Sequence, residues 1–368
     1  MTYDELMPAE IELKLFFPSH TYAEIISHFS SLAEVEIKAP PHLSNAYFDT
    51  HHQDLRCLDM GLRVRVGEHV REQTIKTAGK VVGGIHSRPE YNVDIENDFP
   101  DLSLFPAHIW PQPAMAAQWQ PQLYCLFHTD FERRSWHICV DTSLVEVALD
   151  RGMIRTDDGR QEPICEIEFE LLSGDSHALL VLAQGLAVKV PVAIARASKA
   201  QRGYQLAGLS PLPTVVSSPA LLGMTERQAH IVLLEYGLDA WPMLMENLAA
   251  IDWSAPPRAA HTAVMQASRG WLALINVIEL LAQDALAHGA PQQAHFSLLK
   301  QHLAATAEVL RQCGVVNGTE LHWQHTDTRA QHTLVNHPWA QQLAALQQLP
   351  CIGQIQLALL GQLLQAQR

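Results

Sequence analysis

The chain has 368 residues, of which 48% are hydrophobic and 17% charged, enough for two or three globular domains with sizeable cores. The formal net charge of −14 argues against a protein that coats nucleic acid, because such binding needs a basic surface. No secretory signal and no apolar run of about 18 residues is visible, so we expect a cytoplasmic protein without a membrane span. The six cysteines form no C-x-x-C pair, which favours reduced thiols.

An alternating stretch near the N-terminus, residues 10–14, is the first chemical signal. Successive side chains of a strand point to opposite faces, so Glu10, Glu12 and Lys14 share one face. Two carboxylates two positions apart can reach one divalent cation, and the lysine beside them can reach an anion held by that cation. Taken alone, the pattern fits equally well the wet face of an antiparallel sheet.

Later stretches repeat this pattern with charges of both signs. A helix is expected over residues 22–32, and strands follow over 62–66, 73–77 and 86–92. The charged residues on these strands are Arg63, Arg65, Lys76, Arg88 and Glu90.

A second group of strands begins near residue 123, and a further helix is expected over 175–185. One strand pattern, residues 166–171, carries three glutamates at one parity and apolar residues at the other. The charged candidates of this group and of the segment that closes the first half are Arg133, Asp150, Glu166, Glu168, Glu170, Lys199 and Arg202.

The separation of acidic and basic strands is informative. A merely solvated face has no reason to carry Arg-x-Arg on one strand and three alternating glutamates on another. A charged face turned inward would be costly unless each charge is paired, hydrated or bound to an ion. Carboxylates are the usual ligands of Mg²⁺ or Mn²⁺, and arginine and lysine are the usual partners of phosphate oxygens. The pattern therefore indicates a site for metal ions together with a polyanion.

In this order, the motifs resemble those of the CYTH family, the triphosphate tunnel metalloenzymes. The matching stretches are residues 10–14, 62–65, 74–76, 88–90, 149–150, 166–170 and 198–204. The resemblance implies an α+β chain whose residues 1–207 form a closed antiparallel β-tunnel of about eight strands with outer helices. It also implies metal-dependent hydrolysis of inorganic triphosphate to pyrophosphate and orthophosphate by in-line attack of water.

The resemblance assigns roles to the charged residues. The metal ligands would be Glu10, Glu12, Asp150, Glu166, Glu168 and Glu170, holding Mg²⁺ or Mn²⁺, with two ions expected. The residues that bind the triphosphate or polyphosphate substrate would be Lys14, Arg63, Arg65, Lys76, Arg88, Arg133, Lys199 and Arg202. Glu90 would line the tunnel, and Glu10, Glu12, Lys14 and Glu168 would be catalytic. Hydrolysis of thiamine or nucleoside triphosphate, adenylate cyclisation and non-catalytic polyphosphate binding remain alternatives.

The second half differs in composition. A Pro/Ser-rich linker over residues 208–218 precedes an expected all-α helical bundle over 219–368. This half resembles the CHAD domain, a helical module often fused behind CYTH domains. His261 and Arg269 fit its pattern, but most of its expected basic positions hold other residues. Packing against the first half or a dimer contact is as plausible a role as ligand binding. The helices are expected over Ala229–Tyr236, Ala263–Ala282, Phe296–Leu310 and Trp339–Leu349.

Overall fold

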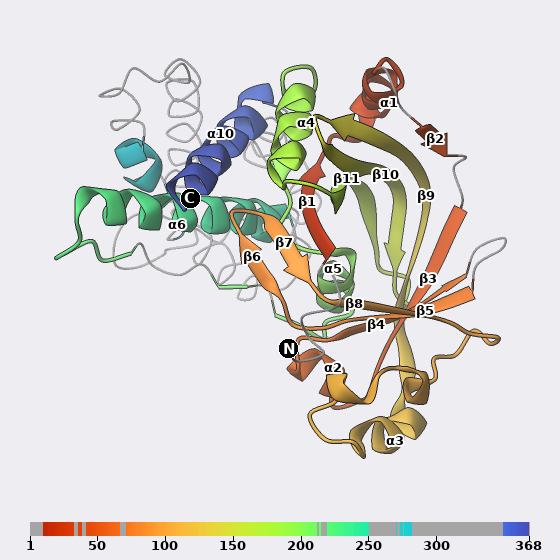
Figure 1. The fold of residues 1–368 in the computed structure, drawn as a ribbon. Helices are drawn as coiled ribbons and strands as arrows, with labels where there is room; N and C mark the ends of the chain where they lie inside the picture. Colours follow the sequence, from red (N-terminus) through yellow and green to blue (C-terminus); the bar gives the residue numbers. More distant parts are fainter. Residues whose placement is uncertain are drawn as a thin grey trace, which may run out of the picture. The chain divides into compact units, whose positions relative to one another are not determined.

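Figure 1 shows the fold in a computed structural model of the chain. The structure describes residues 10–32, 36–38, 42–66, 71–211, 213–214, 219–249, 270, 273–274, 276–281 and 349–367. The chain forms two compact units. The first comprises Met1–Ser19, Ala23–Leu182 and Ala197–Pro211, and the second comprises His20–Tyr22, Ala183–Arg196 and Leu212–Arg368.

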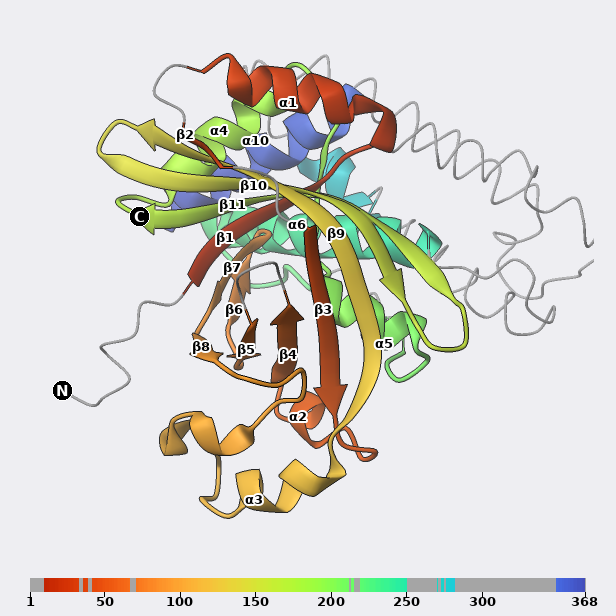
Figure 2. The same cartoon turned by 90° about the vertical axis from the view of Figure 1, so that its right-hand side faces the viewer.

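The first unit is built on one antiparallel sheet. Its long strands are β9 (Tyr124–Val140), β10 (Ser143–Arg155) and β11 (Gln161–Ser173). The others are β1 (Glu10–Phe16), β2 (Glu36–Lys38), β3 (His42–Asp49), β4 (Gly61–Val66), β5 (Arg71–Lys76), β6 (Lys80–Val82), β7 (Ile85–Arg88) and β8 (Glu90–Asp94). Figure 2 shows these strands curling into a strongly curved sheet.

The sheet is not closed, so the expectation of a closed tunnel of about eight strands is wrong. Ten strands follow one open path, β6-β7-β1-β11-β10-β9-β3-β4-β5-β8, and β2 pairs with β9. The chain itself passes from β7, near one end of the path, to β8, at the other end, through Pro89. Proline has no N–H to donate to a ladder, so this junction connects the two ends covalently without a run of strand hydrogen bonds.

The alternation of the sequence separates the two faces of the sheet. In the ladder between β1 and β11, Lys14 lies opposite Glu168, and Leu13 lies opposite Phe169. In the ladders of β10, Asp150 lies opposite both Glu166 and Arg133. Residues opposite each other share a face, so the charged side chains collect on one side, which we call the charged face.

One predicted helix packs on the apolar side of the sheet. The helix α1 (Tyr22–Ser30) buries Ile25 and Phe29, and the Phe29 ring centroid lies 5.4 Å from that of Trp136 and 6.1 Å from that of Phe169. The predicted helix over 175–185 is present as α4 (His177–Ala187). A second apolar cluster, with Leu62 and Ile75 at its centre, involves the connection between β8 and β9. That connection contains η3 (Leu102–Leu104), η4 (Ala107–Ile109), α3 (Met115–Trp119) and η5 (Gln120–Gln122).

The described part of the second unit includes β12 (Ala193–Ile194), α6 (Glu226–Ala249) and α10 (Pro350–Ala366). The helix predicted over Ala229–Tyr236 is confirmed within α6, whereas α10 is missed by the sequence patterns. Of the helix predicted over Ala263–Ala282, residues 270, 273–274 and 276–281 are described, and they are helical. His261, Arg269, Phe296–Leu310 and nearly all of Trp339–Leu349 lie outside the described residues. No helix within the described ranges is long and apolar enough to cross a membrane.

Candidate active site

Three carboxylates form the centre of the charged face. Asp150 on β10 and Glu166 and Glu168 on β11 each offer an oxygen, and these oxygens lie within 4.8 Å of one another. Asp150 and Glu166 have no exposed surface, and the side chain of Glu168 is 14% exposed. Hard carboxylate oxygens converging at this spacing could hold a divalent cation such as Mg²⁺ or Mn²⁺.

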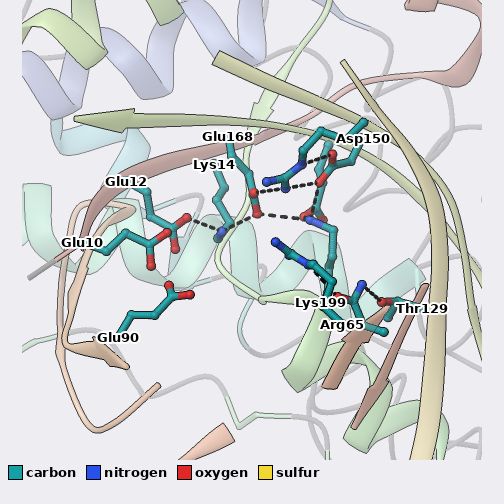
Figure 3. A network of polar contacts seen from close by, with 12 residues as sticks. Glu10, Glu12, Lys14, Arg65, Glu90, Thr129, Asp150, Glu168 and Lys199 are labelled. Carbon is teal, nitrogen blue, oxygen red and sulfur yellow. Dashed lines mark hydrogen bonds and ion pairs between the residues drawn. The ribbon is translucent and has the colours of Figure 1, made fainter. Parts of the chain in front are cut away.

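Cationic side chains interleave with these carboxylates. The Lys199 ammonium forms an ion pair with Glu166 and lies 2.7 Å from an Asp150 oxygen and 3.1 Å from a Glu168 oxygen. Arg133 binds Asp150 through two nitrogens, each at 2.7 Å, and reaches Glu168 at 2.6 Å. Lys14 lies 2.6 Å from both Glu12 and Glu168 (Figure 3). The cluster is therefore charge-paired throughout.

The pKa shifts show that these groups stay ionised. Burial alone raises the pKa of Glu168 and of Asp150. Lys14, Lys199 and Arg133 outweigh burial at Glu168, and Arg133 and Lys199 outweigh it at Asp150, so both pKa values are lowered. Burial likewise works against the charged Lys14, yet Glu12 and Glu168 raise its pKa well above the usual value. Buried charges of opposite sign stabilise one another in this cluster, because each is held by direct ion pairs.

A second group lies around β1, β5 and β8. The Lys76 ammonium forms ion pairs with Glu10 and, at 2.9 Å, with Glu90, and Arg63 lies 3.2 Å from Glu90. Burial, a hydrogen bond with Glu90 and the charge of Glu12 raise the pKa of Glu10 to about 8. Figure 3 shows Glu10, Glu12 and Glu90 on the side of Lys14 away from Asp150.

Arg65 differs from the other cations. Its Nε donates to Asn45 Oδ1 at 3.0 Å, and no carboxylate of the described chain forms an ion pair with it. The positive charge of Arg63, then burial, then Arg133 lower the pKa of Arg65 to about 9. Tyr47 and Glu72, which lies opposite Arg65 in the ladder, offset this repulsion only in part, so the crowded positive charge favours an anion.

The helix α5 (Lys199–Leu206) places Lys199. Ser198 caps the helix by accepting a hydrogen bond from the Gln201 N–H. At Gly203, a Cβ would lie 2.0 Å from the Phe127 ring, so only glycine allows the helix to approach β9 this closely. The Tyr204 hydroxyl donates to buried Asp49 at 2.8 Å, which ties the helix to β3.

Three predicted site residues have their main contacts outside the three central carboxylates. Arg88 donates to the backbone oxygens of Thr77 and Asp59. Arg202 contacts Glu166 at 3.3 Å but is held mainly by Glu162, at 2.6 Å. Glu170 lies opposite Glu12 in the ladder and outside the three-carboxylate group. Burial, Glu146 and Glu12 raise the pKa of Glu170, so it is less ready to carry a negative charge than its neighbours.

The structure also brings uncharged residues to the charged face that the sequence patterns do not single out. Asn45 on β3 accepts from Arg65 and donates to Thr129 Oγ1 at 2.9 Å. Neutral residues carry no charge pattern and belong to none of the motifs. The one available signal was their strand parity relative to Arg65, and parity by itself is too weak to predict a site residue.

Comparison with known proteins agrees with this geometry. The CYTH domain matches residues 8–204 of the chain, which is more than half of it. The chain belongs to the CYTH family. The matched range contains every charged residue predicted to lie in the site.

Individual relatives extend the comparison. An inorganic triphosphatase of Haemophilus influenzae is 36% identical over 208 residues, which are 55% of this chain and 56% of that protein. The chain thus matches little more than half the length of this curated CYTH relative. A Hippeastrum protein described as an adenylyl cyclase with a dominant triphosphatase activity is 20% identical, covers 52% of this chain and 92% of that one, and has a TM-score of 0.40. A Bacillus halodurans protein described as an adenylate cyclase is 21% identical over 56% of this chain and 94% of its own, with a TM-score of 0.32.

Proposed function

We propose that this CYTH protein hydrolyses inorganic triphosphate to pyrophosphate and orthophosphate in a reaction that depends on a divalent metal ion. The observation that carries the proposal is the pairing of three buried carboxylates with lysine and arginine side chains on one face of a curved sheet. A pure anion receptor would gain nothing from the carboxylates, and a pure metal site would gain nothing from so many cations. The 36% identity to an inorganic triphosphatase supports the same substrate.

Asp150, Glu166 and Glu168 would hold the metal, and Glu10 and Glu12 could hold a second ion. When bound, Mg²⁺ or Mn²⁺ would neutralise phosphate oxygens and polarise the bond that breaks. The central carboxylates are hard oxygen donors at matching spacing, so this chain fits such an ion.

Lys14, Arg133 and Lys199 would bind the phosphate oxygens near the carboxylates, and Arg63, Arg65 and Lys76 would bind those farther away. These cations would stabilise the charge that spreads over the transferred phosphoryl group. Water attacks the terminal phosphorus, an O–P bond forms, and the bridging P–O bond breaks to release pyrophosphate. Among the central carboxylates, Glu168 is the partly exposed one, so it would accept a hydrogen bond from that water.

The test is release of orthophosphate from tripolyphosphate, with and without Mg²⁺ or Mn²⁺, in the parent and in Glu10→Ala/Glu12→Ala. The matched control is Glu24→Ala, which removes an exposed carboxylate of α1. We expect metal-dependent turnover in the parent and control, reduced about 100-fold or more in the double variant. ATP, thiamine triphosphate and pyrophosphate run in parallel. Faster turnover of an organic triphosphate would mean that this compound, and not tripolyphosphate, is the substrate. Tight binding without turnover of any compound would refute the proposed enzymatic activity.

A further inference from the structure

We propose that Asn45 is a positioning residue that orients Arg65 toward the anionic substrate without cancelling its charge, and that Thr129 holds Asn45 in place. This inference rests on the proposed function, because it assigns a receptor for one phosphate of that substrate. It concerns three residues on adjacent strands β3, β4 and β9.

Two hydrogen bonds join Thr129, Asn45 and Arg65 in sequence, and we call this arrangement the relay. Thr129 is fully buried and accepts from the Asn45 amide nitrogen at 2.9 Å, which fixes the amide orientation. Asn45, 1% exposed, then presents its carbonyl oxygen to Arg65 Nε at 3.0 Å. The ladders place Asn45 directly opposite both Arg65 and Thr129, so the backbone supports this alignment.

The relay leaves the far end of Arg65 available. Within the described residues, neither terminal nitrogen of Arg65 has a hydrogen-bond acceptor, whereas Arg133 and Arg63 have carboxylate partners. The buried Nε of neighbouring Arg63 also lacks a hydrogen-bond partner. Two arginines with unused donors on adjacent positions of one strand face match the several oxygens of a phosphate group.

An amide at position 45 suits this role better than a carboxylate or a methyl group would. An aspartate there would accept the same hydrogen bond but would pair with the guanidinium and compete with the substrate. An alanine would leave the charge of Arg65 unchanged but would no longer orient its guanidinium group. The neutral acceptor therefore keeps both the geometry and the attraction for an anion.

Asn45→Asp and Asn45→Ala test the two contributions separately. We expect Asn45→Asp to raise the KM for tripolyphosphate roughly 10- to 100-fold, because a charge-assisted contact is lost. Asn45→Ala should raise KM by a smaller factor, and kcat should change less than KM in both. Thr129→Val should resemble Asn45→Ala, and Thr129→Ser, which keeps the hydroxyl, should resemble the parent.

The control for an added charge is Asn97→Asp, at an exposed position after β8. It should leave KM near that of the parent. Thermal unfolding of every variant identifies any that fail to fold, and the Thr129 pair tests the relay if Asn45→Asp does not fold.

Calorimetric titration of metal-free protein with tripolyphosphate separates this inference from catalysis. The expected order of affinity is parent, then Asn45→Ala, then Asn45→Asp. Equal affinity and equal KM in all three would overturn the positioning role and leave only a structural one. A parent that binds with this order but does not turn over substrate would refute the proposed function and keep the inference. A parent that binds tripolyphosphate neither without metal nor with Mg²⁺ would refute both.

Discussion

Lys76 and Glu10 form an ion pair although five strands separate β5 from β1 along the sheet path. The backbone ladder does not close between the two ends of this path, so side chains bridge the charged face instead. Glu90 joins the same lysine at 2.9 Å. The ion pairs of Lys76 therefore connect strands that are far apart along the sheet path.

Replacing Lys76 with methionine should test this bridge. The side chain keeps its apolar stem, but Glu10 loses its cation, and Glu90 keeps only Arg63 as an ion-pair partner. We expect the free energy of unfolding to fall by roughly 1–3 kcal/mol, measured by urea denaturation without metal. Lys80→Met removes an exposed lysine of β6 and should change stability little. Equal stability of both variants would show that the bridge contributes nothing.

The protonation of Glu10 predicts a pH dependence. Its pKa is raised on folding from 4.5 to about 8, chiefly by burial. The folded state therefore binds this proton more tightly than the unfolded state, and the free energy of unfolding falls as pH rises from about 4.5 to about 8.

Glu10→Gln removes this contribution, because the amide is neutral at every pH. In metal-free urea denaturation, we expect the parent to lose stability relative to the variant across this range. The control Glu24→Gln, on the surface of α1, should follow the parent. Parallel stability curves for the parent and Glu10→Gln would contradict the assignment.

Lys199→Met should make the protein depend on metal for its stability. Asp150 and Glu166 are fully buried, and the variant removes a cation that contacts both. Arg133 still contacts Asp150 and Arg202 still contacts Glu166, so we expect the loss of the shared cation to cost roughly 1–3 kcal/mol. We expect a lower melting temperature without metal and a larger rise on adding Mn²⁺ than the parent shows, measured by calorimetry. Lys189→Met, at an exposed position, is the control. The same Mn²⁺-induced rise in variant and parent would count against a metal site at these carboxylates.

Two glycine-to-alanine changes should have opposite signs. At Gly203 the added methyl meets the buried Phe127 ring, so α5 must shift and carry Lys199 with it. We expect a loss of roughly 1–3 kcal/mol in stability together with reduced turnover. Gly185, inside α4, has nothing within 4 Å of the new methyl, and its replacement should stabilise the protein by about 0.5–1 kcal/mol. A neutral Gly203→Ala would mean that α5 tolerates displacement.

Strand parity explains why much of the charged face is predictable. The alternation of residues 10–14 is enough to place Glu12 and Lys14 on one side, because side-chain direction in a strand depends only on position. Parity gives no distance along that side. Arg88 has the right parity, yet it donates to the backbone oxygens of Thr77 and Asp59 instead of to a central carboxylate.

Closure and strand number were less predictable. Whether a sheet closes depends on pairings between segments far apart in the chain and on how strongly the strands curl, and neither leaves a local pattern. The prediction of a closed tunnel therefore failed at β6 and β8, while the predicted helices over 22–32 and 175–185 were confirmed. Asn45 and Thr129 were missed because a neutral hydrogen-bonding pair looks like any other polar pair in the sequence.

The full pairing of Lys14 and Lys199 with carboxylates has a thermodynamic consequence. A cation arriving alone at Asp150, Glu166 and Glu168 must displace these ammonium groups and leave them uncompensated. A polyanion arriving alone must draw the ammonium groups away and leave the carboxylates uncompensated. When both arrive together, each displaced group finds a new partner of opposite charge. The two ligands should therefore bind with positive cooperativity, and each should raise the affinity for the other by the same factor.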